Sequence, residues 1–354
     1  MLQYMSTKEA AAKWNISQRR VSILCSEGRI DGVAMLGNMW IIPRDAVKPD
    51  DARMTRSVIS KGDTHPFIKW AGGKGQVLEI LKKNLPDGMG TSIRKYAEPF
   101  VGGGALMFAL LNEYEFDEVY VNDNNVELMN AYSVIKGNCE KLIEVLAELQ
   151  GEYDSFNEEG QQAYYYEKRE EFNETELSQK TAVKKAALFI FLNKTCFNGL
   201  YRVNKKGKFN VPAGKYKNPL ICDEDNLRKI SAVLKNVVIR ACHYTDVAEF
   251  ADENTFVYFD PPYRPLNKTG FTAYGEDGFN DNDQIELAAF YKTLASKEVK
   301  VLLSNSDPKN VDENDNFFDD LYAGFTIERI HAARSINSDA KKRGDVTELL
   351  IKNY

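Results

Sequence analysis

Short apolar runs recur along the chain from about residue 66 onward, and longer stretches with helical periodicity separate most of them. Seven of these runs have the length and composition of β-strands. They are residues 96–97, 118–122, 237–241, 255–259, 299–303, 325–330 and 347–352. Alternating strands and helices predict an α/β fold with a mostly parallel sheet. Only the loop 333–344 joins the last two runs, which leaves no room for a long crossover helix, so we predict an antiparallel hairpin there.

The first 47 residues have a pattern of their own. The expected elements are a helix over 8–14, a helix from Ser17 to about Glu27, and hairpin strands over 33–36 and 39–42. Thr7 is the expected N-cap of the first helix. This order resembles the small winged helix-turn-helix modules of excisionase and MerR-type proteins, so residues 1–47 are predicted to bind DNA. Arg19 and Arg20 would lie on the first turn of the recognition helix. The alternatives are a protein-contact role and a purely structural role.

Three further parts follow along the chain. Residues 48–65 are polar and aperiodic and are predicted to be a linker. Residues 66–136 and 237–354 contain the strand candidates and form the predicted sheet domain. Residues 137–236 separate its two halves as a mostly helical insertion, and their later part, 193–219, is rich in Asn, Gly, Lys and Tyr. This composition predicts an irregular, basic surface with aromatic side chains, which suits a polymer ligand.

The composition is that of an ordinary soluble protein, with 43% of the 354 residues hydrophobic and 28% charged. The longest apolar runs, such as 186–192, are far shorter than the ~20 residues that a membrane-spanning helix needs, and no charged-then-apolar leader opens the sequence. We therefore expect a cytoplasmic protein without membrane contact. The five cysteines never form a C-x-x-C motif and the three histidines are scattered. The sequence thus predicts no disulfide framework and no metal site.

The formal net charge of −6 argues mildly against a nucleic-acid partner, because phosphate contacts require lysine and arginine. Local clusters of basic residues weaken this objection. They comprise Arg19 and Arg20; Lys205, Lys206, Lys208, Lys215 and Lys217; and Lys341, Lys342 and Arg343. Each cluster taken alone is equally compatible with an ordinary solvated surface.

Two glycine-containing segments are candidate ligand sites. Residues 66–74 have the sequence PFIKWAGGK, in which two glycines allow close backbone approach while Trp70 offers a flat face and Lys74 a charge. Residues 98–105 have the sequence EPFVGGGA and lie between a predicted strand and a predicted helix. In doubly wound sheets this arrangement places a ligand at the carboxyl end of the first strand. Because the segment is not G-x-G-x-x-G, a dinucleotide is disfavoured.

Two carboxylates are predicted to lie at strand ends. Asp123 follows the glycine segment by about 20 residues, which suits a ribose hydroxyl pair, although an ordinary turn alone explains it better. Asp260 begins the sequence Asp260-Pro261-Pro262-Tyr263 directly after an apolar strand. Two prolines hold that loop rigidly. Asp260 and the Pro261 carbonyl can then serve as paired acceptors for an amino group, while Tyr263 stacks on the ring that carries it.

These four segments, in this order, resemble the Dam and DpnM-like DNA adenine methyltransferases, whose motifs are FxKWAGGK, EPFxGxG, a strand-end Asp, a recognition insertion and DPPY. The resemblance extends over about residues 66–352. It implies a Rossmann-like sheet that binds S-adenosylmethionine, and methyl transfer to N6 of adenine in duplex DNA after base flipping, without a metal, in a prokaryotic cell or a phage. The residues implied in donor binding are Trp70, Lys74, Glu98, Phe100, Gly102, Gly104, Asp123 and Asp260. Those implied in catalysis are Asp260, Pro261, Pro262 and Tyr263.

The resemblance also implies a DNA-reading segment. Residues 198–202 (NGLYR) and 209–212 (FNVP) closely match family members that read GATC, so GATC or a related short site is expected. The residues implied in DNA contact are Asn198, Leu200, Arg202, Pro212 and Lys215, and residues 334–337 (RSIN) resemble a further family segment. Tyr201 and Lys215 stand where GATC-reading relatives have Cys and Arg, and Lys cannot reproduce a bidentate Arg contact. The residues carry no signal for or against a restriction endonuclease partner.

Three alternative functions fit parts of the sequence. The same acceptor geometry fits the exocyclic amine of cytosine, but the recognition segment favours adenine. A DNA-binding regulator with a decayed catalytic domain is disfavoured by the intact DPPY and KWAGGK motifs. A methyltransferase acting on protein or RNA amides is disfavoured by Asp rather than Asn at position 260 and by the DNA-reading module at the front.

Overall fold

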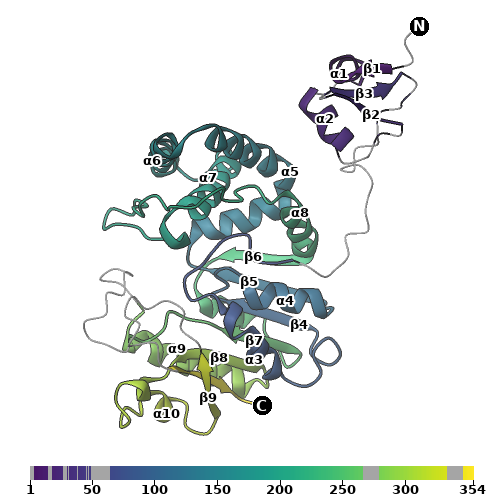
Figure 1. Ribbon diagram of the computed structural model, residues 1–354. Coiled ribbons are helices and arrows are strands. Elements are labelled where there is room, and N and C mark those ends of the chain that lie inside the picture. The colour runs from purple at the N-terminus through teal and green to yellow at the C-terminus, as the bar shows by residue number, and fades with distance from the viewer. Residues whose placement is uncertain are drawn as a thin grey trace. The chain divides into compact units, whose positions relative to one another are not determined.

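The computed structural model describes residues 4–14, 18–26, 30, 32–37, 39–44, 46, 48, 64–265, 279–332 and 346–354. The chain divides into two compact units, Met1–Ile59 and Ser60–Tyr354 (Figure 1). The boundary between them falls within the predicted linker, 48–65. The Thr64 hydroxyl donates to Asn112 at 2.7 Å, and the His65 backbone is hydrogen-bonded to the Asn226 side chain.

The described residues of the first unit form two short helices and a three-stranded antiparallel sheet of order β1-β3-β2. Its elements are β1 (Tyr4–Ser6), α1 (Thr7–Trp14), α2 (Gln18–Ser26), β2 (Ala34–Leu36) and β3 (Met39–Pro43). Helices and a hairpin thus stand at the predicted positions, whereas the three-residue β1 is too short for a periodicity to reveal it. The DNA-binding role of the unit remains a prediction.

The predicted N-cap of α1 is wrong by one residue. The Ser6 hydroxyl, not that of Thr7, accepts a hydrogen bond from the Glu9 backbone N–H at 3.2 Å. The Glu9 carboxylate accepts in return from the Ser6 backbone N–H at 2.8 Å. This reciprocal pair is a capping box, and it satisfies two N–H groups that the helix itself leaves unpaired.

A seven-stranded sheet forms the centre of the second unit. Its strands are β4 (Lys95–Pro99), β5 (Glu118–Asp123), β6 (Val237–Ala241), β7 (Thr255–Phe259), β8 (Lys300–Ser306), β9 (Thr326–Ala332) and β10 (Val346–Lys352). Their order is β6-β5-β4-β7-β8-β10-β9. The first five are parallel, and β10 runs antiparallel to both β8 and β9. The predicted mostly parallel sheet and its C-terminal hairpin are therefore confirmed, and the sheet is consistent with a Rossmann-like methyltransferase.

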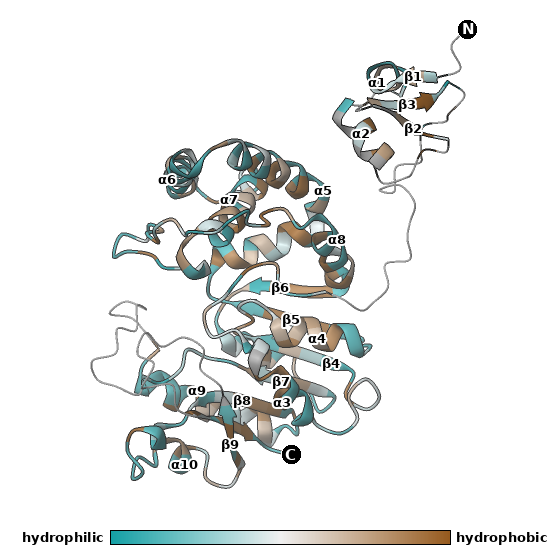
Figure 2. Ribbon diagram, in the orientation of Figure 1, coloured by the Kyte–Doolittle hydropathy of each residue, from teal (hydrophilic) through white to brown (hydrophobic). Residues whose placement is uncertain are grey.

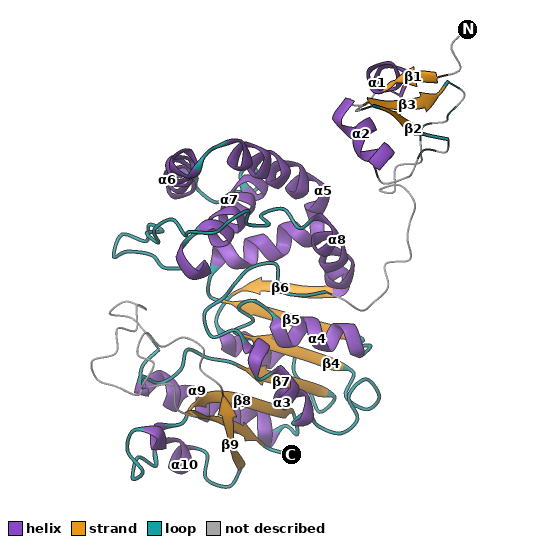
Figure 3. Ribbon diagram, viewed as in Figure 1, coloured by secondary structure: helices purple, strands orange, loops and turns teal. Residues whose placement is uncertain are grey.

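Side chains of the central strands alternate between two buried faces, as the twofold period of a strand requires. In β7, Phe256 and Tyr258 join one hydrophobic cluster, while Val257 and Phe259 join the other. Helices cover both faces, so the unit has three layers (Figure 3). One face packs against α3 (Leu78–Lys83), α4 (Ala105–Glu113) and α5 (Val126–Ser155), and the other against α9 (Asp281–Ser296) and α10 (Phe317–Leu321).

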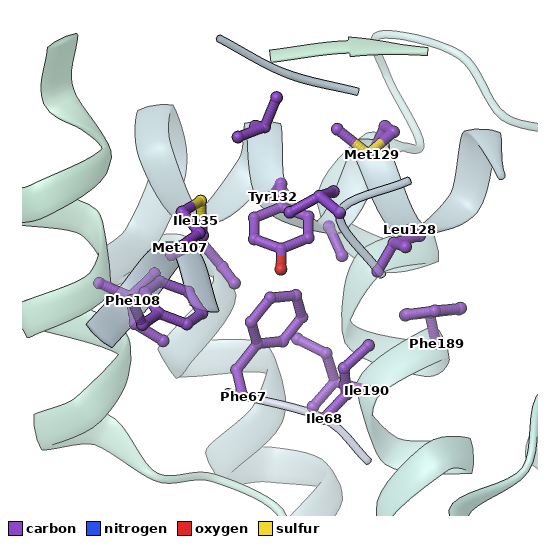
Figure 4. Packing of buried hydrophobic residues seen from close by; sticks show 14 of the residues in the cluster. Phe67, Ile68, Met107, Phe108, Leu128, Met129, Tyr132, Ile135, Phe189 and Ile190 are labelled. Atoms are coloured by element: carbon purple, nitrogen blue, oxygen red, sulfur yellow. The ribbon is translucent and has the colours of Figure 1, made fainter. Parts of the chain in front are cut away.

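Tyr132 of α5 connects this core to the loop that follows β4. Its ring meets Phe67 edge-on with centroids 5.0 Å apart and lies 6.4 Å from the ring of Phe108 (Figure 4). Its hydroxyl donates to the Gly102 carbonyl oxygen at 3.1 Å. The hydrophobic core thus fixes the position of a loop in which we predict donor binding.

The stretch 137–236 is occupied by the rest of α5 and by α6 (Glu158–Glu174), α7 (Ala182–Thr195) and α8 (Glu224–Val233). α5 is kinked at Asn138 (φ −137°, ψ 37°), close to the predicted start of the insertion. The outer helix α6 is largely hydrophilic, in contrast to strands β7 and β8 (Figure 2). Between α7 and α8 the backbone forms a hairpin-like excursion with antiparallel bridges Cys196↔Ala213 and Val203↔Phe209. We refer to residues 196–216 as the 196–216 segment.

Two kinds of feature are missing from the part of the chain that the structure describes. None of its helices is both long enough and apolar enough to cross a lipid bilayer. Among the described residues, no group of three or more His, Cys, Asp or Glu side chains is placed so that it could hold a metal ion.

Candidate active site

Three carboxylates and a glycine loop converge at one edge of the parallel sheet. β4 is paired in parallel with β5 on one side and β7 on the other, so the carboxyl ends of all three strands lie at the same edge. Glu98, Asp123 and Asp260 stand at or directly after these ends. Strand order reverses at β4, which makes this edge a topological switch point, the usual ligand site of an open α/β sheet.

Two glycines of the loop after β4 are required by their surroundings. Gly102 and Gly104 have φ of +48° and +70°. A Cβ atom at Gly102 would stand 2.7 Å from Trp70 Cδ1, and one at Gly104 would stand 2.6 Å from the Tyr132 hydroxyl. Only glycine permits both the positive φ and these close approaches.

Phe100 in the same loop also has a positive φ, +71°, although it carries a side chain. The Phe100 and Val101 backbone N–H groups both donate to the Asn122 carbonyl, at 2.9 and 3.1 Å. The Phe100 ring stacks on Tyr244 with centroids 5.2 Å apart. Strained conformations of this kind persist where surrounding contacts hold them, and they cluster at functional sites.

Asp123 connects the end of β5 to the glycine loop. Its Oδ2 accepts from the Gly102 backbone N–H at 3.2 Å and its Oδ1 from the Asn125 N–H at 2.9 Å. Burial raises the pKa of this carboxyl, although the backbone N–H groups oppose the shift. A carboxylate offers about four acceptor positions, so Asp123 retains capacity for hydroxyl donors of a ligand.

Lys74 contacts the Asp260 carboxylate and the Tyr263 hydroxyl. Its Nζ lies 2.8 Å from Asp260 Oδ1 and donates to the Tyr263 hydroxyl at 2.7 Å. The Tyr263 hydroxyl in turn donates to Glu348 Oε2 on β10 at 3.0 Å. Burial raises the pKa of Asp260, and the ammonium of Lys74 opposes this shift. The structure thus brings the predicted donor-binding Lys74 into direct contact with the predicted catalytic loop.

Glu98 lies in the interior of the protein and is not open to solvent. Its side chain is buried, and its Oε2 accepts a hydrogen bond from the Tyr96 hydroxyl at 2.5 Å. Burial raises the pKa of Glu98 to about 8, and the nearby charge of Asp260 acts in the same direction. Burial thus favours the neutral form of the Glu98 carboxyl, which lessens its repulsion of the Asp260 carboxylate.

Buried amides support the loop that contains Pro261 and Pro262. Gln284 of α9 donates from Nε2 to the Pro262 carbonyl at 3.1 Å, and its Oε1 accepts from Asn305 Nδ2 at 3.0 Å. Asn305 Oδ1 accepts from the Arg264 backbone N–H at 3.1 Å. The rigidity predicted from two prolines is thus reinforced from α9 and β8.

Trp70 joins the two glycine-containing segments to the insertion. Its ring stacks on Tyr201 with centroids 5.7 Å apart and an interplanar angle of 24°, and it lies 6.3 Å from Phe189 at a tilt. On the glycine-loop side it contacts the backbone of Gly102. The aromatic residue at position 201, which departs from the family pattern, therefore packs directly on a predicted donor-binding residue.

The predicted DNA-contact residues of the insertion are all exposed and lie in the 196–216 segment. They are Asn198, Leu200, Arg202, Pro212 and Lys215. Arg202 is held in orientation because its Nε donates to Asn210 Oδ1 at 2.8 Å. Arg19 and Arg20 lie in α2 of the first unit. Residues 334–337 lie outside the described part of the chain.

Two residues in this region were not assigned from the sequence. Glu348 is the hydrogen-bond acceptor of Tyr263, and the available signal was a carboxylate within the otherwise apolar run of the last strand. Asn193, near the end of the apolar helix α7, makes three hydrogen bonds to the backbone of Lys69 and Gly199. No pattern in a single sequence distinguishes such an amide from an exposed one.

The comparisons with known proteins agree with this geometry. The family described as D12 class N6 adenine-specific DNA methyltransferase matches residues 70–336. A type II methyltransferase, M.MjaIII from Methanocaldococcus jannaschii, is 51% identical over 295 residues, which are 82% of this chain and 100% of that protein. The type II methyltransferase M1.LlaDCHI from Lactococcus lactis is 38% identical over 83% of this chain and 97% of its own length. A DNA adenine methylase from Haemophilus influenzae is 34% identical over 80% and 92%, respectively. The chain therefore belongs to the D12 class of N6 adenine-specific DNA methyltransferases.

Proposed function

We propose that this protein transfers a methyl group from S-adenosylmethionine to N6 of adenine in a short duplex DNA site, GATC or a close relative, after flipping the base out of the helix. The observation that carries this proposal is the position of Asp260. Its carboxylate, at the end of β7, lies 2.8 Å from Lys74 and at the same sheet edge as the loop of Gly102. The sulfonium of the bound donor supplies the electrophilic methyl.

The residues present fit such a donor. Asp123 keeps free acceptor positions for ribose hydroxyls beside the Gly102 N–H, as argued above. Trp70, packed against the same glycine, presents an aromatic wall. The backbone N–H groups of Phe100 and Val101 hold the loop in a preformed shape through their hydrogen bonds to the Asn122 carbonyl. Lys74 supplies a cation that suits a ligand carboxylate.

Catalysis then depends on orientation of the target amine. The adenine N6 group donates hydrogen bonds to Asp260 and to the Pro261 carbonyl, which turns the nitrogen lone pair toward the methyl for in-line displacement. The methyl–sulfur bond breaks as the bond to N6 forms, S-adenosylhomocysteine leaves, and the Asp260 carboxylate takes the proton that N6 then loses. Tyr263 stacks on the adenine ring. Its hydroxyl is fixed by Lys74 and Glu348, so the ring keeps one orientation.

The GATC assignment rests on the 196–216 segment. Arg202 is the candidate for base reading, because its guanidinium is exposed and oriented by Asn210. Residues 1–47, within the first unit, are proposed as a second DNA-binding module through Arg19 and Arg20 on α2. The type II names of two relatives favour a role beside a restriction endonuclease.

The test is modification-sensitive sequencing of DNA from methylation-deficient cells that express the full chain. We expect methyladenine confined to one short motif, and none in cells that express the matched Asp260→Ala variant. Methylcytosine would overturn the adenine assignment. Methyladenine in another motif would overturn GATC alone, and full modification by the Asp260→Ala variant would overturn the catalytic role of this carboxylate.

A further inference from the structure

Asn193 joins two segments that are far apart in the sequence. It lies near the end of α7 and is only 4% exposed. Its Oδ1 accepts from the Lys69 backbone N–H at 2.9 Å, and its Nδ2 donates to the carbonyls of Lys69 at 2.8 Å and Gly199 at 2.9 Å. Both amide protons of Asn193 are thus engaged, so its side chain has a single orientation.

The two joined segments touch closely at this point. Gly199 has a φ of +64°, and a Cβ atom there would stand 2.6 Å from Lys69 Cβ. The Lys69 ammonium lies 4.4 Å from the centroid of the Tyr216 ring, at the other end of the 196–216 segment. A displacement of the turn at Gly199 therefore has to displace Lys69 as well.

Lys69 is followed directly by residues of the donor side of the site. Trp70 stacks on Tyr201 and contacts Gly102. Lys74 is bonded to Asp260. Residues 69–74 thus contact the proposed DNA-reading segment at one end and the catalytic carboxylate at the other.

We propose that Asn193 is a positioning residue that couples DNA binding by the 196–216 segment to donor binding by residues 69–74. The proposal rests on the proposed function, because it takes duplex DNA and S-adenosylmethionine as the two ligands. DNA that fixes the turn at Gly199 also fixes Lys69 and Trp70 through the three bonds of Asn193. Each ligand then raises the affinity of the other by the same factor.

The chain offers a matched control in Asn226 of α8. This amide is also buried, and it contacts the backbone of His65 in the same manner, accepting from its N–H at 3.2 Å and donating to its carbonyl at 3.0 Å. Asn226 thus supports the chain shortly before the same glycine-containing segment. Its contact reaches His65 rather than the turn at Gly199.

The experiment measures the affinity of the full chain for S-adenosylhomocysteine by calorimetry, without and with a saturating GATC duplex. We expect the duplex to raise the affinity of the wild type for S-adenosylhomocysteine by a factor on the order of tenfold. Asn193→Asp keeps the side-chain hydrogen-bond acceptor but loses both N–H groups. The coupling factor, which is the ratio of the two affinities with and without duplex, should then fall to about one. Asn226→Asp should keep the wild-type factor, even though both variants lower Tm.

Three results would overturn the proposal. In the first, the wild type binds S-adenosylhomocysteine and the duplex independently. In the second, Asn193→Asp keeps the full coupling. In the third, Asn193→Asp and Asn226→Asp lose the coupling equally, which indicates that either substitution simply loosens the structure. If Asn193→Asp does not fold, Gly199→Ala forces the same contact apart, because its Cβ would stand 2.6 Å from Lys69 Cβ. Unchanged coupling in that variant counts against the proposal. A wild type that binds no nucleoside at all overturns the donor assignment instead, and this inference with it.

Discussion

The Tyr263 hydroxyl donates a hydrogen bond to the Glu348 carboxylate at 3.0 Å and so connects the proposed catalytic loop after β7 to strand β10. We expect Glu348→Ala to lower kcat about tenfold, because a hydrogen bond to a charged group contributes roughly 1.5–3 kcal/mol. Glu348→Gln keeps an acceptor and should lose less. Steady-state kinetics with S-adenosylmethionine and duplex DNA measure the effect.

The control for this variant is Glu328→Ala on the neighbouring strand β9. Glu328 pairs with Lys352 at 2.7 Å and is 41% exposed, so its loss should leave kcat near the wild-type value. An unchanged kcat in Glu348→Ala, or an equal loss in both variants, would contradict a positioning role for Glu348.

Lys74→Met should move the acidic limb of the pH–rate profile to higher pH. Burial already raises the pKa of Asp260, and the Lys74 ammonium opposes this shift. Without that cation the pKa of Asp260 rises further, so a higher pH is needed to produce the carboxylate that is proposed to accept a hydrogen bond from the target amine. The profile of kcat against pH is the measurement. If the acidic limb keeps its position while the plateau value of kcat falls, Lys74 acts on S-adenosylmethionine alone and not on the pKa of Asp260.

Most of the fold could be predicted from the sequence because it depends on local patterns. Each of the seven strands overlaps one of the short, mostly apolar runs of the sequence, and the alternation within β7 sends Phe256 and Val257 to opposite faces. β1 escaped prediction because three residues carry no periodicity. The cap of α1 was misplaced because Ser6 and Thr7 are both good N-caps, and only the Glu9 side chain selects Ser6.

The site could be predicted only where its residues form a motif. Asp260 and Tyr263 lie within four consecutive positions, and the rigidity of that loop is a local property. The bond from Tyr263 to Glu348 connects residues 85 positions apart, and that from Asn193 to Lys69 connects residues 124 positions apart. Such contacts arise from the packing of the completed sheet and helices, which no spacing in the chain encodes.

Glu98→Gln should stabilise the protein, and increasingly so as pH rises from about 5 to about 8. The folded-state pKa of Glu98 is raised to about 8 by burial, whereas an exposed Glu titrates near 4.3. Between these values the unfolded state loses the proton while the folded state keeps it, so wild-type stability falls with pH. Glutamine does not titrate, and the advantage should reach a few kcal/mol, since one pKa unit corresponds to about 1.36 kcal/mol.

The measurement for Glu98 is the Tm difference between Glu98→Gln and the wild type at several pH values. Glutamine can still accept the hydrogen bond from the Tyr96 hydroxyl, which keeps the comparison fair. A Tm difference that stays constant between pH 5 and 8 would show that Glu98 does not titrate abnormally in the folded protein.

Gly102→Ala should weaken donor binding by an order of magnitude or more, and Gly324→Ala serves as its control. Both positions have positive φ, +48° and +94°, so both variants should lose about 1–2 kcal/mol of stability from backbone strain. Only at Gly102 does the new Cβ meet another group, Trp70 Cδ1 at 2.7 Å, whereas nothing lies within 4 Å at Gly324. The indole of Trp70 has to move to accommodate this Cβ, and the wall of the proposed donor site moves with the indole.

Calorimetric titration with S-adenosylhomocysteine, together with the Tm of each variant, separates the loss of affinity from the loss of stability. Equal affinities in the two variants would mean that the contact between Trp70 and the glycine loop does not shape the donor site.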